Sequence, residues 1–380
     1  MTEDLVERAG QLKRQLVDFS KQTRYDRAFR EFVAQHGDGA EAWDEDRAML
    51  LWDTFLLEHR FRNGRSIVEQ FVDARPDLSP AERQMLLGWH DVVTGVFEVK
   101  GRDGPALVLA NLVDDLTYRT RSTAGRSVFR RMPKRSFLLT RLVAVGDEWV
   151  FSGPTSVLRP AERDVAVQVA LQISVRSPEL AFRNAEKLAL AWELQRVDRQ
   201  RFVRFFGSDL VVVPGDRAQQ RLDEFSAFRQ EEILREDPEK ARHIGRSPAR
   251  VVELPPDLVD AETVALIHDE DDGLGFYEEF GLVEQAFADP DLLRRRAYRE
   301  QVLAYLHDDS VEPMVLRRLA DRDPDKAGVL FRRLLKRPRF DWARDGEELL
   351  RSVKAEYFAR PRLPTITPVG ERLAAYARQR

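Results

Sequence analysis

The hydrophobic pattern changes at Val93, and this change limits the folds open to the chain. From there to Leu158 the sequence is rich in β-branched and aromatic residues that partly alternate with polar ones, as in VFEVKGRDGPALVLANLVDDLTYRTR. Asp103-Gly104, Asp114-Asp115 and Gly146-Asp147 mark turns within it. About five short strands in some 60 residues predict a small β-barrel of the SH3 or OB kind.

Helical patterns lie on both sides of this β-rich stretch. Apolar residues recur at helical spacing between Leu5 and Val33. Ser79, Pro80 and Glu82 supply the cap, first-turn proline and capping-box glutamate of a helix start. Similar starts are predicted at Ser177-Pro178, Asp237-Pro238, Asp289-Pro290 and Asp323-Pro324. Short strands are predicted in DLVVVPG and TVALIHD.

The predicted fold class is therefore α+β, mainly helical, with an inserted small barrel of the SH3 or OB kind. We expect a helical domain at 1–92, the barrel at 93–158, a helical domain with one short strand at 159–245, and a mainly helical C-terminal domain at 246–380.

Composition excludes several classes of site. The chain has 380 residues, a net charge of −4 and no cysteine, so disulfides, thiolate metal sites and cysteine nucleophiles are excluded. No stretch has the length and apolarity of a signal peptide or membrane span, so we expect a cytoplasmic protein without a membrane partner. Familiar phosphate-loop, dinucleotide and metalloprotease motifs are absent, and we predict no catalytic residue, metal or cofactor.

Two acidic sequence patterns suggest alternative functions, a cation site and a nuclease site. In HDEDDGLGFYEEF, placing Gly273 at the EF-hand glycine puts Asp272 and Glu279 at ligand positions, but also puts His268 first and Gly275 eighth, where they do not fit. A solvated acidic turn is the preferred interpretation, and cation binding by residues 268–280 is left open.

Pro76-Asp77 followed by Glu98 and Lys100 resembles a nuclease signature. A metal-dependent nuclease is a distant third hypothesis for function.

The strongest signal is a run of basic residues from Arg119 to Arg141, here called the basic segment, which contains no acid. Small barrels bind nucleic acid by combining cations with aromatic platforms. We therefore predict a non-enzymatic DNA- or RNA-binding protein. The predicted contact residues are Arg119, Arg121, Arg126, Phe129, Arg130, Arg131, Lys134 and Arg135.

Three other interpretations of the basic segment stay open. It can be a basic loop without a partner, it can dock on acids of the same chain such as the Glu41–Asp46 region, or it can meet an acidic protein partner. The last would make the protein an interaction adaptor. A second cationic run, FRRLLKRPRFDWARDGEELLRSVK, is predicted to be the polar face of a packed helix.

The order of segments resembles a known protein family. The segments are LLWDTFLLEHRFRNGRSIVEQF, GDEWVFSG, FVRFFGSDLVVVPG and RFDWARDGEELLR. On these the chain resembles an uncharacterised bacterial family whose members often carry a C-terminal cysteine-rich SEC-C zinc motif. The resemblance implies a shared arrangement over most of the chain, and it brings no catalytic residues. The zinc motif is absent here because the chain has no cysteine.

Overall fold

The computed structural model describes residues 2–36, 45–236 and 253–377. The chain forms two compact units. Unit 1 comprises residues 1–188 and 367–380, and unit 2 comprises residues 189–366. The division falls within one helix, α8 (Ala185–Phe206). Within the described residues, no helix is both long enough and apolar enough to cross a bilayer.

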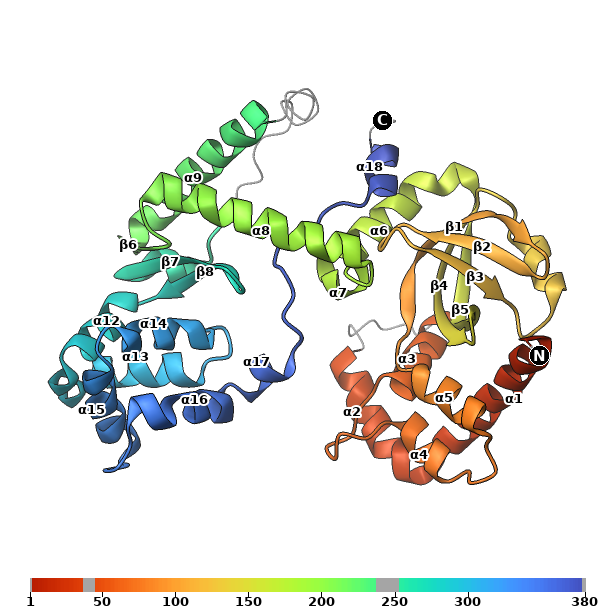
Figure 1. The fold of residues 1–380 in the computed structure, drawn as a ribbon, viewed down its shortest axis with the longest axis horizontal. Helices are drawn as coiled ribbons and strands as arrows, with labels where there is room; N and C mark the ends of the chain where they lie inside the picture. Colours follow the sequence, from red (N-terminus) through yellow and green to blue (C-terminus); the bar gives the residue numbers. More distant parts are fainter. Residues whose placement is uncertain (1, 37–44, 237–252, 378–380) are drawn as a thin grey trace. The chain divides into compact units, whose positions relative to one another are not determined.

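Unit 1 begins with a group of helices around an apolar core that includes Leu12, Leu16, Phe55 and Trp89. Ser79 caps the last of these helices through a capping box with Glu82, as predicted. The elements are α1 (Thr2–Ser20), η1 (Thr23–Tyr25), α2 (Asp26–His36), α3 (Glu45–Leu57), α4 (Ile67–Asp73) and α5 (Pro80–Gly88). They form the red and orange part of Figure 1.

Five strands follow and form one sheet. They are β1 (Val93–Asp103), β2 (Ala106–Asn111), β3 (Thr117–Arg121), β4 (Phe137–Val145) and β5 (Glu148–Leu158). The pairs run in the order β1-β2-β3-β5-β4, and β4 pairs again with β1, so every strand has two neighbours. The β3–β5 pair is parallel and all the others are antiparallel. The ring of pairs encloses Phe97, Leu109 and Leu138.

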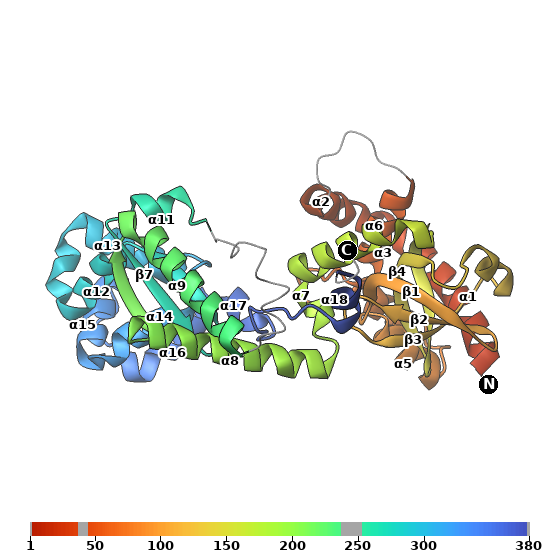
Figure 2. The ribbon, with the colours of Figure 1, turned by 90° about the horizontal axis from the view of Figure 1, so that it is seen from above.

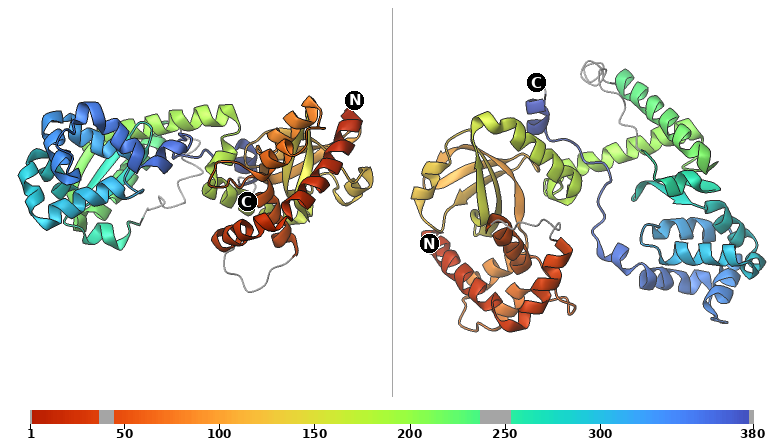
Figure 3. Two further views of the ribbon diagram at one scale, coloured as in Figure 1. Left: turned by 90° about the horizontal axis from the view of Figure 1, so that it is seen from below. Right: turned by 180° about the vertical axis from the view of Figure 1, so that it is seen from behind.

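The outer surface of this sheet is covered by helices of unit 1. Val143 and Val145 pack against the N-terminal helices, and Val96 packs against a second group. That group comprises η3 (Pro160–Glu162), α6 (Arg163–Arg176), α7 (Pro178–Ala181) and α18 (Glu371–Ala377). The blue helix α18 lies beside α6 in Figures 1 and 3, and its Leu373 is buried in their shared core. Helix α18 therefore forms part of the core of unit 1.

Unit 2 is built on the antiparallel sheet β6 (Leu210–Pro214), β7 (Thr263–Asp269) and β8 (Gly273–Glu278). Side chains alternate along β7, so that Val264 and Leu266 pack with α8, α9 and α11, while Ala265 and Ile267 pack with the helices from α12 to α16. Figures 1 and 2 show these two layers. The helices are α9 (Gly215–Glu236), α11 (Pro256–Asp260), α12 (Phe280–Ala288), η4 (Pro290–Arg294), α13 (Arg296–His307), α14 (Pro313–Asp321), α15 (Pro324–Leu335), α16 (Trp342–Val353) and α17 (Ala355–Ala359).

The α+β class predicted from sequence is confirmed. β1 begins at Val93 and β5 ends at Leu158, where the predicted barrel begins and ends. The four-domain division stays a prediction, and its boundary at 245, like the helix start at Asp237-Pro238, lies outside the described residues. Strand β8 was not predicted, because its glycines and acids resemble a turn.

Candidate nucleic-acid interface

The basic segment contributes a connection between β3 and β4, residues 122–136, here called the cationic loop. A short 3₁₀ helix, η2 (Arg126–Arg131), forms its middle. Phe129 and Met132 point into the enclosed core of the sheet, and Phe129 is only 3% exposed. The prediction that Phe129 offers a ring for base stacking is therefore wrong. Its ring stabilises the loop by removing apolar surface from water.

Backbone hydrogen bonds fix the C-terminal end of the cationic loop to β1. The Arg135 N–H donates to the Val99 carbonyl at 2.8 Å, and the Val99 N–H donates to the Ser136 carbonyl at 2.9 Å. The Arg102 guanidinium donates to the Phe129 carbonyl at 3.1 Å. Arg135 adopts a left-handed conformation, φ 70°, which is unfavourable for a residue with a Cβ. The loop is thus tied at several points.

With two apolar side chains directed inward, the basic side chains of the cationic loop point to solvent. No acid occurs within residues 122–136. The exposed cations are Arg126, Arg130, Arg131, Lys134 and Arg135. Arg102, near the end of β1, adds an exposed guanidinium beside them. Sequence reasoning missed Arg102, because only the strand pairing brings β1 next to the loop.

The other cations of the basic segment are occupied by acids of unit 1. Arg119 forms ion pairs with Asp103 and Glu148, and Arg121 pairs with the same Glu148 at 3.3 Å. Their partner Glu148 is buried. Arg119 and Arg121 thus hold β3 against β5, and a phosphate would have to compete with these carboxylates.

Arg141 and Phe137, at the far end of the basic segment, are buried. Arg141 pairs with Asp53 and Glu58 of the N-terminal helical region. Docking on acids of the same chain therefore accounts for part of the basic segment, through acids that differ from those proposed from sequence. The Glu41–Asp46 region lies largely outside the described residues.

A pocket of about 210 Å³ adjoins the N-terminal end of the cationic loop. Arg121, Thr123 and Arg126 line it on the loop side, and Glu7 lines it on α1. Gly10 of α1 lies so close to Thr123 that an added Cβ would come within 2.9 Å of the threonine Cβ. This close approach of α1 supports the part of the loop that precedes η2.

The acidic stretch 268–280 forms part of the β7–β8 hairpin, with a turn at residues 270–272. Gly273 takes a left-handed φ of 72° at its tip. Three of its carboxylates have cationic or phenolic partners: Asp269 pairs with Arg318 at 2.9 Å, Asp271 pairs with Arg362 at 2.7 Å, and Asp272 accepts a hydrogen bond from Tyr357. The interpretation as a solvated turn is wrong for Asp269 and Asp272, which are half-buried against neighbouring helices, but it holds for Glu270 and Asp271, which are exposed in the turn.

His268, placed first in the EF-hand alignment, is buried with its Nε2 3.4 Å from Asp198. In the ranges that the structure describes, no three His, Asp or Glu side chains are arranged to hold a metal ion.

The residues of the nuclease pattern have partners within the chain. Exposed Asp77 pairs with Arg75 in the turn before α5. Glu98 is buried on β1 and accepts from Tyr376 of α18.

Comparison with known proteins adds no assignment. No family model, curated protein or solved structure matches this chain. The resemblance to the bacterial SEC-C-associated family therefore stays a prediction, and function has to be argued from the geometry of the chain itself.

Proposed function

We propose that this protein binds nucleic acid through the cationic loop and acts as a binding protein and not as an enzyme. The phosphate contacts are assigned to Arg130, Arg131, Lys134 and Arg135. The observation that carries the proposal is their joint exposure on one tied loop that contains no acid. These four cations form no ion pair within the described residues, so their charge is available to phosphates, and neutralising a phosphate releases counterions.

We further propose that the five-stranded sheet is a small closed barrel of the OB kind, in preference to the SH3 kind. The strand order β1-β2-β3-β5-β4 and the parallel β3–β5 pair support this, since they place a three-strand meander beside a returning strand. The cationic loop is then the connection that crosses from the meander to β4.

The expected binding mode is backbone recognition without base stacking. The two phenylalanines of the basic segment are both buried, so they offer no ring to a base. Contacts made by guanidinium and ammonium groups to phosphates position a strand and carry little sequence information. We therefore expect weak sequence preference and steep salt dependence.

The test is fluorescence anisotropy with labelled single-stranded and duplex DNA and RNA at about 50 and about 200 mM salt. The loop variant changes Arg130, Arg131, Lys134 and Arg135 to glutamine. Loss of four phosphate contacts should reduce the slope of log affinity against log salt by roughly 3. Between those two salt concentrations the parent should therefore lose about a hundredfold more affinity than the variant.

The matched control removes four exposed cations of unit 1 outside the loop, by changing Arg14, Lys21, Arg62 and Arg176 to glutamine. It should bind almost as the parent does, because only distant charge is lost. If the control and the loop variant lost nucleic-acid affinity equally, the loss would be due to net charge alone, and the proposal would be contradicted. Absence of binding by the parent at low salt would refute it and favour the alternative of an acidic protein partner.

A further inference from the structure

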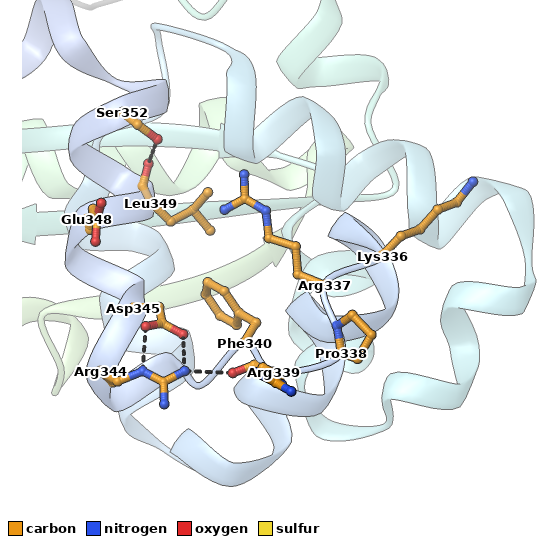
Figure 4. A pocket seen from close by; sticks show the side chains of 10 residues that line it. All are labelled: Lys336, Arg337, Pro338, Arg339, Phe340, Arg344, Asp345, Glu348, Leu349 and Ser352. Carbon is orange, nitrogen blue, oxygen red and sulfur yellow. Dashed lines mark hydrogen bonds and ion pairs between the residues drawn. The ribbon is translucent and has the colours of Figure 1, made fainter.

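A pocket of unit 2 lies where α15 ends and α16 begins, far along the sequence from the cationic loop. Its volume is about 710 Å³, within the range of small-molecule sites. Helix α15 ends at Leu335, and the next residue, Lys336, adopts a left-handed conformation, φ 55°. The residues that follow run as a loop along one side of the pocket, and α16 forms the other side (Figure 4).

This loop was predicted from sequence to be part of a helix, and that prediction is wrong. Lys336 leaves the helical conformation, and Pro338 is two residues further on. A proline in the next turn could not donate the backbone hydrogen bond that continuation of α15 requires. The cations of the KRPRF stretch therefore line a pocket in place of covering a helix face.

Positive charge dominates the walls of the pocket. Lys336, Arg337 and Arg339 are exposed, and none of them forms an ion pair with any residue in the described ranges. Arg344 is neutralised by Asp345, which it contacts through two bonds of 2.7 Å. That pairing, assisted by other groups including Arg337, lowers the pKa of Asp345 to about 2, so the pair stays charged.

One further acid lines the pocket, Glu348 on α16. It forms no ion pair within the described residues, so it opposes the three unpaired cations alone. After the Arg344–Asp345 pair is cancelled, the lining keeps three positive charges and one negative charge. A ligand with two or more negative charges complements this lining.

The backbone that carries these cations is held in place before any ligand arrives. The Arg337 N–H donates to the Arg332 carbonyl and the Phe340 N–H to the Arg337 carbonyl, each at 3.1 Å. Arg344 donates to the Arg339 carbonyl at 2.6 Å. The Phe340 ring packs against Phe331, with centroids 5.8 Å apart. Binding therefore does not have to order the loop, a cost that commonly offsets ionic attraction.

We propose that this pocket binds a phosphate-bearing small molecule about the size of a nucleotide. Arg337 and Arg339 present planar guanidinium groups that match phosphate oxygens in pairs, and Lys336 adds a point charge. Phe340, Leu349 and Pro338 supply an apolar surface for the organic part of the ligand. The site is independent of the cationic loop, because every lining residue belongs to unit 2.

The test is isothermal titration calorimetry of the full chain with ATP, pyrophosphate and adenosine at low salt. The parent should bind ATP with a dissociation constant below about 1 mM, and pyrophosphate more weakly. The variant R337Q/R339Q should bind ATP at least tenfold more weakly. The control R217Q/R235Q removes two exposed arginines of α9 in the same unit and should bind as the parent does.

A second variant distinguishes loss of ligand contacts from loss of folding. E348Q removes the opposing acid and should tighten ATP binding about fivefold, a gain that misfolding cannot produce. The proposal is overturned if the parent binds neither ATP nor pyrophosphate, if R337Q/R339Q binds like the parent, or if adenosine binds as tightly as ATP. Loss of RNA binding in R337Q/R339Q without any response to ATP would assign the pocket to a polymer and would also overturn it.

Discussion

Asp53 of α3 is the buried acid on which buried Arg141 and half-buried Lys13 of unit 1 depend. It is 4% exposed and accepts hydrogen bonds from Lys13 Nζ at 2.7 Å and Ser152 Oγ at 2.8 Å. Its other oxygen lies 3.1 Å from Arg141 Nε. Burial lowers the pKa of Lys13, and the charge of Asp53 acts in the opposite direction. Asp53 therefore links α1, α3 and the five-stranded sheet.

The change Asp53→Asn keeps the side-chain size and removes this charge. Lys13 then has no buried anion opposite it, and Arg141 keeps Glu58, whose side chain is 44% exposed. Removing one partner of a buried ion pair costs about 3–5 kcal/mol, because the remaining charge stays desolvated. For a unit of this size, such a loss corresponds to a fall in melting temperature of roughly 10 °C.

Differential scanning calorimetry of the full chain measures this, since the unit 1 transition alone should move. Asp73→Asn is the control, because Asp73 is exposed and pairs with exposed Arg65, and it should leave the melting temperature unchanged. Adding Lys13→Met to Asp53→Asn should restore part of the loss, since one unpaired cation is gone. A loss below about 1 kcal/mol in Asp53→Asn would refute the reasoning.

Three further outcomes are expected. Burial, with the neighbouring acids Asp269, Glu312 and Asp271, raises the pKa of Asp272 to about 6 from 3.8, against the hydrogen bond from Tyr357. The folded state then keeps a proton that the unfolded state loses, so this group lowers stability as pH rises from about 4 to about 6. Asp272→Asn should flatten that part of the urea-denaturation profile and stabilise the protein at pH 7 by on the order of 1 kcal/mol after allowance for solvent screening; an unchanged profile would contradict this. Phe129→Leu should cost about 1 kcal/mol in urea denaturation yet leave nucleic-acid affinity within about twofold, because the ring is buried; a loss near the 1–3 kcal/mol typical of base stacking would show that the ring contacts bases. Leu373→Ala, at a side chain 1% exposed, should destabilise unit 1 by about 2–5 kcal/mol in calorimetry, and a neutral result would mean that α18 does not contribute to that core.

Local signals in the sequence were sufficient for much of the fold. The capping box at Ser79 and the cap at Asp323 form as predicted, because a cap depends on residues within one turn. Asp289-Pro290 begins a short 3₁₀ helix, and Ser177 makes no side-chain cap. Strand β8 was missed because its pairing with β7 compensates for weak strand residues, and that compensation depends on tertiary contacts.

The charge of the candidate site could be predicted from sequence, but the availability of that charge could not. Arg121 and Arg131 look equivalent in the basic segment. Arg121 ends a strand beside buried Glu148, which lies 27 residues later in the sequence. Arg131 lies between the buried side chains of Phe129 and Met132 and is itself exposed to solvent. Only the register of β3 with β5 separates the two. Sequence reasoning therefore overestimated the number of cations in the segment that are available to a phosphate.

The same criterion, a cation without an acid partner on a fixed backbone, identifies both proposed sites. In a chain with 61 basic and 65 acidic residues, most arginines can find a carboxylate, so an unpaired group of them has to be accounted for. The cationic loop exposes its cations to solvent and rests on buried Phe129, which suits an extended phosphate chain. The KRPRF loop borders a concave pocket with an apolar wall, which suits a compact phosphate ester. Because the two groups lie in different units, each can be removed without altering the other.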